Sequence, residues 1–296
     1  MIRFGAPVFL NQQMRSTGAG ESHGVATQDP YALARAHKQK GYTAAYAPQI
    51  DLHDTALIRE FRTAFEREGI IFAEVGYWDN LIDSDPQSRT DHRRKMVEAL
   101  ALAEELGARC AVNIFGSYCH GHGISRHLPE NFSAQAFDDA VDMARFFIDE
   151  VKPKTAFFTY EIFPFSVIDS PTEIARLIAA VDRKQFGVHL DLVNLINSPR
   201  AYWRSGDIMR ECVRLFGNRI VAAHGKDVKM EEPAISVILK EVIAGTGQLD
   251  ITSFVSELQR LPQAVPLMLE HLANEAEYDQ AAAHYRQVAA NVGITI

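Results

Sequence analysis

The run TYEIFP at residues 159–164 decides the fold, together with three later runs that share its character. Each is a short, apolar, β-favouring stretch that ends in an acid or a histidine, and a stretch of helical character separates each from the next. The later three are VHLDLVN at 188–194, VAAHGKD at 221–227 and PLMLEH at 266–271. Strands that stay apolar and then offer one charged side chain at the carboxyl end are typical of the active-site rim of a (β/α) barrel.

The spacing of these strand-end residues supports the same architecture. The four are Glu161, Asp191, His224 and Glu270, which stand 30, 33 and 46 positions apart. The first two separations match one βα unit of about thirty residues, and the third matches a unit that carries an insertion.

Strand and helix patterns alternate eight times along the chain. The expected strands cover 2–10, 43–47, 70–78, 109–115, 155–163, 185–192, 219–223 and 265–269. The expected helices cover 29–40, 54–68, 84–106, 133–151, a stretch that begins at 170, 198–217, 250–261 and 275–292. The pattern predicts an α/β protein, a (β/α)8 TIM barrel that forms one domain over residues 1–296. Residues 11–28 form a long polar loop, which we interpret as a lid over the barrel mouth.

Composition excludes several classes of function. A formal net charge of -8 argues against a nucleic-acid partner, which needs concentrated Lys and Arg. No apolar run approaches the roughly 18 residues of a membrane span, so no membrane partner is expected. The three cysteines form no C-x-x-C pair and indicate a reducing compartment. The start of the sequence lacks the apolar region of a signal peptide, which favours the cytoplasm.

The strand-end quartet has the chemistry of a divalent metal site. A lone strand-end acid is usually solvated, but parallel barrel strands bring their carboxyl ends around one mouth, where four such side chains converge. Oxygen donors with one imidazole suit manganese, magnesium or zinc. Three carboxylates would also repel one another unless a cation neutralised them.

Several further residues are candidates for substrate contact, each with a structural alternative. His189 points into the interior like Asp191, where it contacts substrate or is a packed core histidine. Lys226 stabilises charge on a substrate oxygen or forms a salt bridge with Asp227 or another acid. His120 and His122 are rim residues or ordinary surface histidines.

Two more features near the expected strand ends also have alternatives. Trp78 forms the floor of a sugar-sized pocket, or packs in the core with other aromatic residues. The sequence Gly245-Thr246-Gly247 indicates a turn rather than a phosphate loop.

Nearly the whole chain resembles the xylose isomerase-like TIM barrel superfamily, in particular its sugar phosphate isomerase/epimerase branch. The stretches that carry the resemblance are AEVGYW at 73–78, Glu161, DLVN at 191–194, HGKD at 224–227, GTGQLD at 245–250 and LEH at 269–271. The resemblance implies that the quartet binds a divalent ion, with manganese first and magnesium, cobalt or zinc as alternatives. It also implies metal-dependent proton transfer on a hydroxy-carbonyl sugar or polyol through an enediolate, with Glu161 and Glu270 as the acid–base pair.

Two positions depart from the pattern of ketose 3-epimerases in that superfamily. Asn194 stands where those enzymes carry a histidine, and Met230 stands where they carry an arginine; both of their residues contact substrate. The Asp-x-x-Asn and His-x-Lys-Asp forms resemble instead the sugar phosphate epimerase-like and inosose dehydratase-like groups. Asn194 is therefore a further candidate for substrate contact.

The leading hypothesis is a metal-dependent sugar or sugar phosphate isomerase or epimerase of carbohydrate metabolism, with a small-molecule sugar or polyol as its partner. The alternative is a lyase or dehydratase on a keto-sugar, keto-inositol or 3-keto-glycoside, which uses the same enediolate. A DNA-repair endonuclease and a non-catalytic sugar-binding barrel are further alternatives. The sequence leaves a homo-oligomer open.

Overall fold

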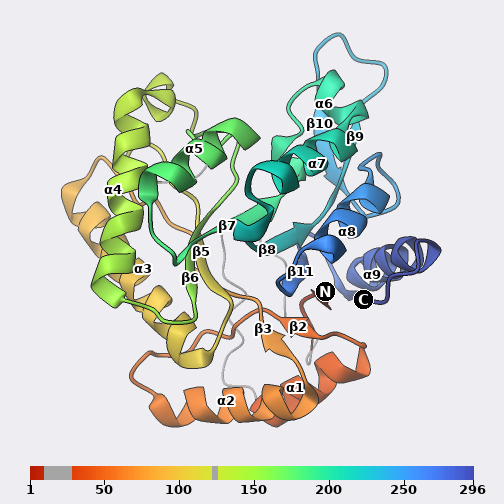
Figure 1. The fold of residues 1–296 in the computed structure, drawn as a ribbon, viewed down its shortest axis with the longest axis horizontal. Helices are drawn as coiled ribbons and strands as arrows, with labels where there is room; N and C mark the ends of the chain where they lie inside the picture. Colours follow the sequence, from red (N-terminus) through yellow and green to blue (C-terminus); the bar gives the residue numbers. More distant parts are fainter. Residues whose placement is uncertain (10–28, 122–125) are drawn as a thin grey trace.

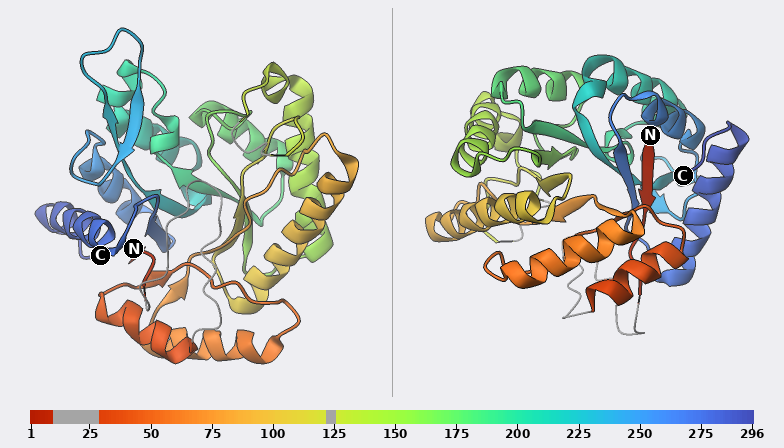
Figure 2. Two further views of the ribbon diagram at one scale, coloured as in Figure 1. Left: turned by 180° about the vertical axis from the view of Figure 1, so that it is seen from behind. Right: turned by 60° about the horizontal axis from the view of Figure 1, so that its bottom comes forward.

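A computed structural model describes residues 1–9, 29–121 and 126–296 of the chain. The expected lid over 11–28 and the candidate His122 lie outside the described residues. Within them, helices surround a curled parallel sheet, and the first strand lies inside the ring of helices (Figures 1 and 2). The two chain ends lie near each other in every view.

Seven of the strands form one parallel sheet in the order β1-β11-β8-β7-β6-β5-β4. In that order they span Ile2–Gly5, Val265–Leu269, Ile220–Gly225, Phe186–Asp191, Phe157–Glu161, Cys110–Asn113 and Glu74–Gly76. A separate parallel pair joins β2 (Ala44–Ala45) to β3 (Ile71–Phe72).

This pair bridges the two edges of the seven-stranded sheet. On one side, the Thr43 backbone N–H donates to the Phe4 carbonyl of β1 at 2.8 Å. On the other side, β3 continues after one residue into β4. A Cβ at Gly5 would lie 2.2 Å from the Ala44 carbonyl oxygen, so only glycine allows β1 and β2 to approach this closely. The eight barrel positions are thus filled, and the predicted TIM barrel is confirmed.

The structure differs from the sequence prediction in three places. The stretch 70–78, which was expected to be one strand, forms the two short strands β3 and β4. The Ala73 backbone N–H between them still donates to the Ala45 carbonyl of β2, and the strand partner then changes from β2 to β5. The expected helix over 198–217 breaks at Arg204 (φ -126°) into α6 (Pro199–Trp203) and α7 (Ser205–Phe216). The irregular stretch after the seventh barrel strand contains an antiparallel hairpin, β9 (Asp227–Met230) and β10 (Leu239–Val242), which projects at the upper right of Figure 1.

The other helices begin and end at the signals in the sequence. They are α1 (Pro30–Gln39), α2 (Thr55–Glu68), α3 (Pro86–Leu106), α4 (Ala134–Val151), α5 (Pro171–Val181), α8 (Ile251–Arg260) and α9 (Glu275–Asn291). Short 3-10 turns cover Pro129–Phe132, Val193–Leu195 and Gly217–Arg219. The side chains of Asp85 and Ser133 cap α3 and α4 by accepting backbone N–H groups of the first turn. Gly107 ends α3 in the left-handed region, at φ 75°.

The barrel strands are buried on both faces, as a parallel sheet between helices requires. Every residue of β5, β7, β8 and β11 is buried. Within the described residues, no helix is long and apolar enough to cross a bilayer.

We expect the buried His37 on α1 to make stability depend on pH. Its side chain is 4% exposed, and its Nδ1 donates to the Leu33 carbonyl at 2.9 Å. Burial lowers the pKa of His37 to about 4, against the opposing effect of the Leu33 hydrogen bond. Between pH 6.5 and 4 the unfolded chain therefore binds a proton that the folded chain does not. The free energy of unfolding should fall by about 3 kcal/mol over this window as pH falls.

Urea unfolding of the wild type and His37→Gln at pH 7.5, 5.5 and 4 measures this effect. The variant should lose that part of the pH dependence, whereas His53→Gln, a change at an exposed residue, should keep it. Identical pH profiles for the wild type and His37→Gln would contradict the assignment.

Candidate metal centre and active site

Four neighbouring strands bring the predicted quartet together at their carboxyl ends. Glu161 ends β6, Asp191 ends β7, His224 lies near the end of β8, and Glu270 directly follows β11. His224 Nδ1 lies 2.8 Å from Glu270 Oε1, 2.9 Å from Glu161 Oε1 and 3.9 Å from Asp191 Oδ2. One ligand atom from each of the four lies within 4.8 Å of the others.

Backbone hydrogen bonds orient Asp191. Its Oδ1 accepts the backbone N–H groups of Val193 at 2.9 Å and Asn194 at 3.3 Å, which directs Oδ2 to the cluster. The Asn194 side-chain amide donates to the Ile162 carbonyl at 3.0 Å. Asn194 therefore lies beside the cluster, where it connects the ends of β6 and β7.

Lys226 is buried among the acids of the cluster. Its Nζ lies 2.6 Å from Asp191 Oδ2, 2.5 Å from Glu270 Oε1 and 3.3 Å from Glu241 Oε1. The salt-bridge alternative is therefore the one observed, with these acids rather than with Asp227. Burial lowers the pKa of Lys226, but Asp191 and Glu270 raise it more, so its pKa stands well above the usual value.

The charged groups of the cluster shift one another's pKa values. Burial lowers the pKa of His224, but Glu270 and Glu161 raise it more, so its pKa stands well above the usual value. Burial also raises the pKa of Asp191 to about 6, although Lys226 opposes this. Positive charge on Lys226 and His224 offsets part of the negative charge of Glu161, Asp191 and Glu270.

A second layer of buried polar groups lies behind His224, and it contains a residue that the sequence analysis did not select. His189 Nε2 donates to Glu74 Oε2 at 2.6 Å, and His224 Nε2 lies 3.5 Å from Glu74 Oε1. Burial raises the pKa of Glu74, but the two histidines lower it further, to about 2. Glu74 thus orients the His189 ring by a hydrogen bond and lies at ion-pair distance from the His224 ring. In the sequence, the one signal that could have identified Glu74 is that it is the single acidic residue of the apolar run 70–75.

His189 is therefore a packed, hydrogen-bonded core histidine, which was the alternative to substrate contact. Its side chain is fully buried, its ring centroid lies 4.2 Å from that of His224, and its Nδ1 has no hydrogen-bond partner among the described residues.

The rim candidates lie apart from the cluster. The side chain of His120 is 68% exposed, and its Nδ1 bonds to Asp83 Oδ1 at 3.0 Å, which joins the loops after β4 and β5. Trp78 is half-buried over Gly76, where an added Cβ would lie 2.7 Å from the indole Nε1. No hydrogen bond, ion pair or ring contact among the described residues joins either side chain to the quartet.

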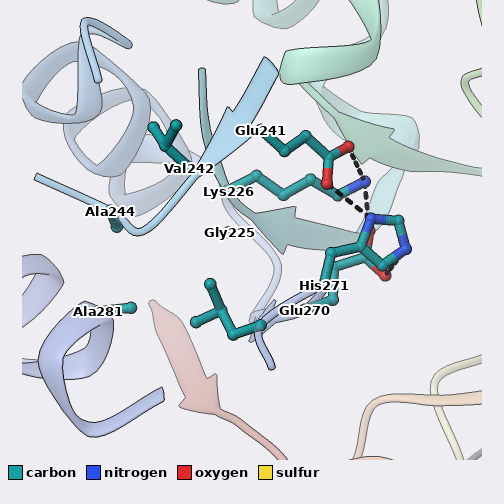
Figure 3. Close-up of a pocket in the computed structure, with 9 residues that line it drawn as sticks. Gly225, Lys226, Glu241, Val242, Ala244, Glu270, His271 and Ala281 are labelled. Atoms are coloured by element: carbon teal, nitrogen blue, oxygen red, sulfur yellow. Dashed lines mark hydrogen bonds and ion pairs between the residues drawn. The ribbon is translucent and has the colours of Figure 1, made fainter. Parts of the chain in front are cut away.

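A pocket beside the quartet brings in two more residues that the site prediction omitted. Lys226, Glu241, Glu270 and His271 line it and point toward one another (Figure 3). Glu241 comes from β10, and its Oε2 accepts a hydrogen bond from His271 Nδ1 at 2.7 Å. Glu241 lies in the inserted hairpin, where no sequence pattern pointed to the site.

The quartet fits a divalent metal ion. Carboxylate oxygens and an imidazole nitrogen bind such ions at about 2.0–2.6 Å, which allows donor atoms about 3–5 Å apart. The donor atoms of Glu161, Asp191, His224 and Glu270 lie within 4.8 Å of one another, close enough to share one ion. The Glu74 carboxylate, 3.5 Å from His224 Nε2, lies on the side where an acid orients a metal-ligating histidine, although no hydrogen bond joins the two atoms.

The chain belongs to the xylose isomerase-like TIM barrel family, whose sequence model matches residues 34–288. This confirms the resemblance inferred from the sequence. No curated protein matches the chain in sequence.

Solved structures of the same fold include sugar epimerases. D-psicose 3-epimerase from Clostridium cellulolyticum H10, solved with D-tagatose, is 14% identical with a TM-score of 0.65 over 90% of this chain and 95% of that one. 3-Keto-D-glucoside 4-epimerase from E. coli is 15% identical, with a TM-score of 0.64 over 97% and 100%. A xylose isomerase-like TIM barrel protein from Mycobacterium smegmatis, solved with magnesium, is 15% identical, with a TM-score of 0.63 over 87% and 86%. At these identities the likeness shows the fold.

Proposed function

We propose that the chain is a divalent-metal-dependent sugar isomerase or epimerase that moves a proton at a carbon next to a carbonyl. The observation that carries the proposal is the order of the quartet along the sheet. Glu161 and Glu270 come from β6 and β11, at the two ends of an arc whose middle strands supply Asp191 and His224. A substrate that lies across the arc has one carboxylate at each end.

Glu161, Asp191, His224 and Glu270 would hold the ion, with manganese as the first candidate and magnesium, cobalt or zinc as alternatives. When bound, such an ion polarises a carbonyl and its neighbouring hydroxyl and stabilises negative charge on their oxygens. The structure with magnesium in the same fold and the sugar epimerases among the structural neighbours support this proposal.

The two glutamates are in the protonation state that a base requires. Burial raises the pKa of each, but His224 and Lys226 together lower it more, so both pKa values lie below the usual value. Glu161 is 6% exposed, which limits the access of water to a proton held on its carboxylate. One glutamate removes the proton and the other, after it has taken up a proton from solvent, returns one: return to the opposite face of the same carbon gives an epimer. Return to the adjacent carbon gives an isomer.

Proton exchange with solvent tests this function directly. The purified protein is incubated in deuterium oxide with a panel of keto-sugars and 3-keto-glycosides, and NMR follows the hydrogen next to the carbonyl. We expect exchange that stops when the metal is chelated and returns with Mn²⁺. Release of an aglycone or of water would instead identify a lyase or dehydratase. Protein that binds no divalent metal and exchanges no hydrogen would refute the proposal.

A further inference from the structure

The inserted hairpin brings an acid to the edge of the quartet. Glu241 lies in β10, opposite Val228 of β9, and these two strands form a sheet apart from the barrel. Its side chain reaches the pocket beside Glu270, where it is 36% exposed (Figure 3). Glu241 lies outside the stretches that carry the family resemblance, so its role has to be inferred from its contacts.

Glu241 and Glu270 share the same two basic side chains. Glu241 Oε1 lies 3.3 Å from Lys226 Nζ, and its Oε2 accepts a hydrogen bond from His271 Nδ1 at 2.7 Å. Lys226 Nζ also lies 2.5 Å from Glu270 Oε1, and His271 Nε2 lies 3.6 Å from Glu270 Oε2. The four side chains form a closed ring, which we call the Glu241 ring. Each oxygen of the Glu270 carboxylate therefore faces one of the two basic groups that Glu241 holds.

The backbone at His271 brings its side chain into this ring. Successive side chains of an extended strand point to opposite faces, so Glu270 and His271 would point apart if the strand continued. His271 instead adopts the left-handed region, at φ 58°, and both side chains line the same pocket. A residue other than glycine is strained in this region and persists there only where its surroundings hold it. The hydrogen bond to Glu241 is one contact that holds it.

The base of the hairpin is fixed, which gives Glu241 a defined position. Asp227, the first residue of β9, is 1% exposed and pairs with Val242 of β10. Its carboxylate accepts the backbone N–H groups of Gly245 and Gly247, both at 2.9 Å. These bonds join β9 to the segment that follows β10, one residue after Glu241 leaves its own pair.

We propose that Glu241 is a positioning residue for Glu270. It holds Lys226 and His271 against the two oxygens of the Glu270 carboxylate, and so fixes the direction in which that carboxylate faces the quartet. The inference rests on the proposed function, in which Glu270 is one of the two proton-transfer groups. A displacement of such a group by about 1 Å can slow the reaction by about 100-fold.

The visible absorption bands of bound Co²⁺ test the inference without any turnover, because they depend on the ligands that surround the ion. Spectra are compared for the wild type, Glu241→Ala, Glu270→Gln and the double variant. We expect Glu241→Ala to shift the bands in the same direction as Glu270→Gln, and the double variant to match Glu270→Gln alone. Glu231→Ala is the control, because Glu231 lies on the same hairpin and pairs with the exposed Lys240; it should keep the wild-type spectrum.

A wild-type spectrum in Glu241→Ala with one Co²⁺ bound would overturn the inference. A double variant that differs from Glu270→Gln would also overturn it, because Glu241 would then act on the ion by another route. If Glu241→Ala does not fold, Glu241→Gln replaces it and should give a smaller shift in the same direction, since an amide cannot pair with the charge of Lys226. Protein that binds no Co²⁺ would refute the proposed function and this inference with it, a result distinct from the other two.

Kinetics separate positioning from substrate contact. In the hydrogen-exchange assay, we expect kcat of Glu241→Ala to fall about 30-fold, with KM within about threefold of the wild type. Glu241→Gln should recover part of the rate, because its amide oxygen still accepts the hydrogen bond of His271. A higher KM with unchanged kcat would show that Glu241 contacts substrate, and would overturn the positioning role. If the wild type exchanges hydrogen on no sugar of the panel, the proposed function loses support, while the Co²⁺ spectra still decide the inference.

Discussion

Replacement of either Glu161 or Glu270 by glutamine is expected to lower kcat for hydrogen exchange by about 1,000-fold. Glutamine keeps the size of the side chain and one oxygen donor, but it cannot take up a proton. Both carboxylates lie within 2.9 Å of His224 Nδ1, at the two ends of the arc of strands. Each variant therefore loses one of the two proton-transfer groups.

Metal content separates proton transfer from metal binding in these variants. A variant that retains the metal in a one-to-one ratio and loses activity has lost the acid–base group. A variant that also loses the metal has lost a ligand, and excess Mn²⁺ should then restore part of its activity. Glu60→Gln, an exposed change on α2, is the matched control. Exchange at the wild-type rate in both Glu161→Gln and Glu270→Gln would contradict the assigned roles.

Glu74→Leu is expected to lower the free energy of unfolding by about 4 kcal/mol. Glu74 is 2% exposed and is paired with His189 and His224, which the change would leave buried without their acceptor. Urea unfolding of the metal-stripped protein measures the loss without a contribution from metal binding.

Glu74→Gln is the matched variant, because it keeps the shape and one acceptor oxygen. We expect a smaller loss of stability from it, together with weaker metal binding, since His224 loses the carboxylate that orients its ring. If Glu74→Leu were within about 0.5 kcal/mol of the wild type, the proposed support of the two histidines would be wrong.

The barrel could be predicted from the sequence because its signals are local. Apolar strand runs, helix caps such as Asp85 and Ser133, and the left-handed Gly107 each depend on a few neighbouring residues. Strands that all run in one direction then bring residues at their carboxyl ends to the same mouth. For that reason the four predicted ligands meet in the structure.

The roles of the remaining candidates depend on distant partners. The sequence left open whether His189 contacts substrate. It gave no reason to select Glu74, the hydrogen-bond partner of His189, because the two residues lie 115 positions apart. It named Asp227 as one possible partner of Lys226, but Asp227 accepts backbone N–H groups of a loop that returns 18 to 22 residues later.

The sequence by itself therefore determined the class of fold, the eight repeats and the four residues whose side chains converge. Only the tertiary structure decided which buried acid pairs with which cation, how the broken third strand closes the barrel, and that the Gly245–Gly247 loop already encloses a carboxylate. The physical reason is that periodicity and capping act over one or two turns of chain. Pairing of buried charges acts through space, between side chains on strands that are far apart along the chain.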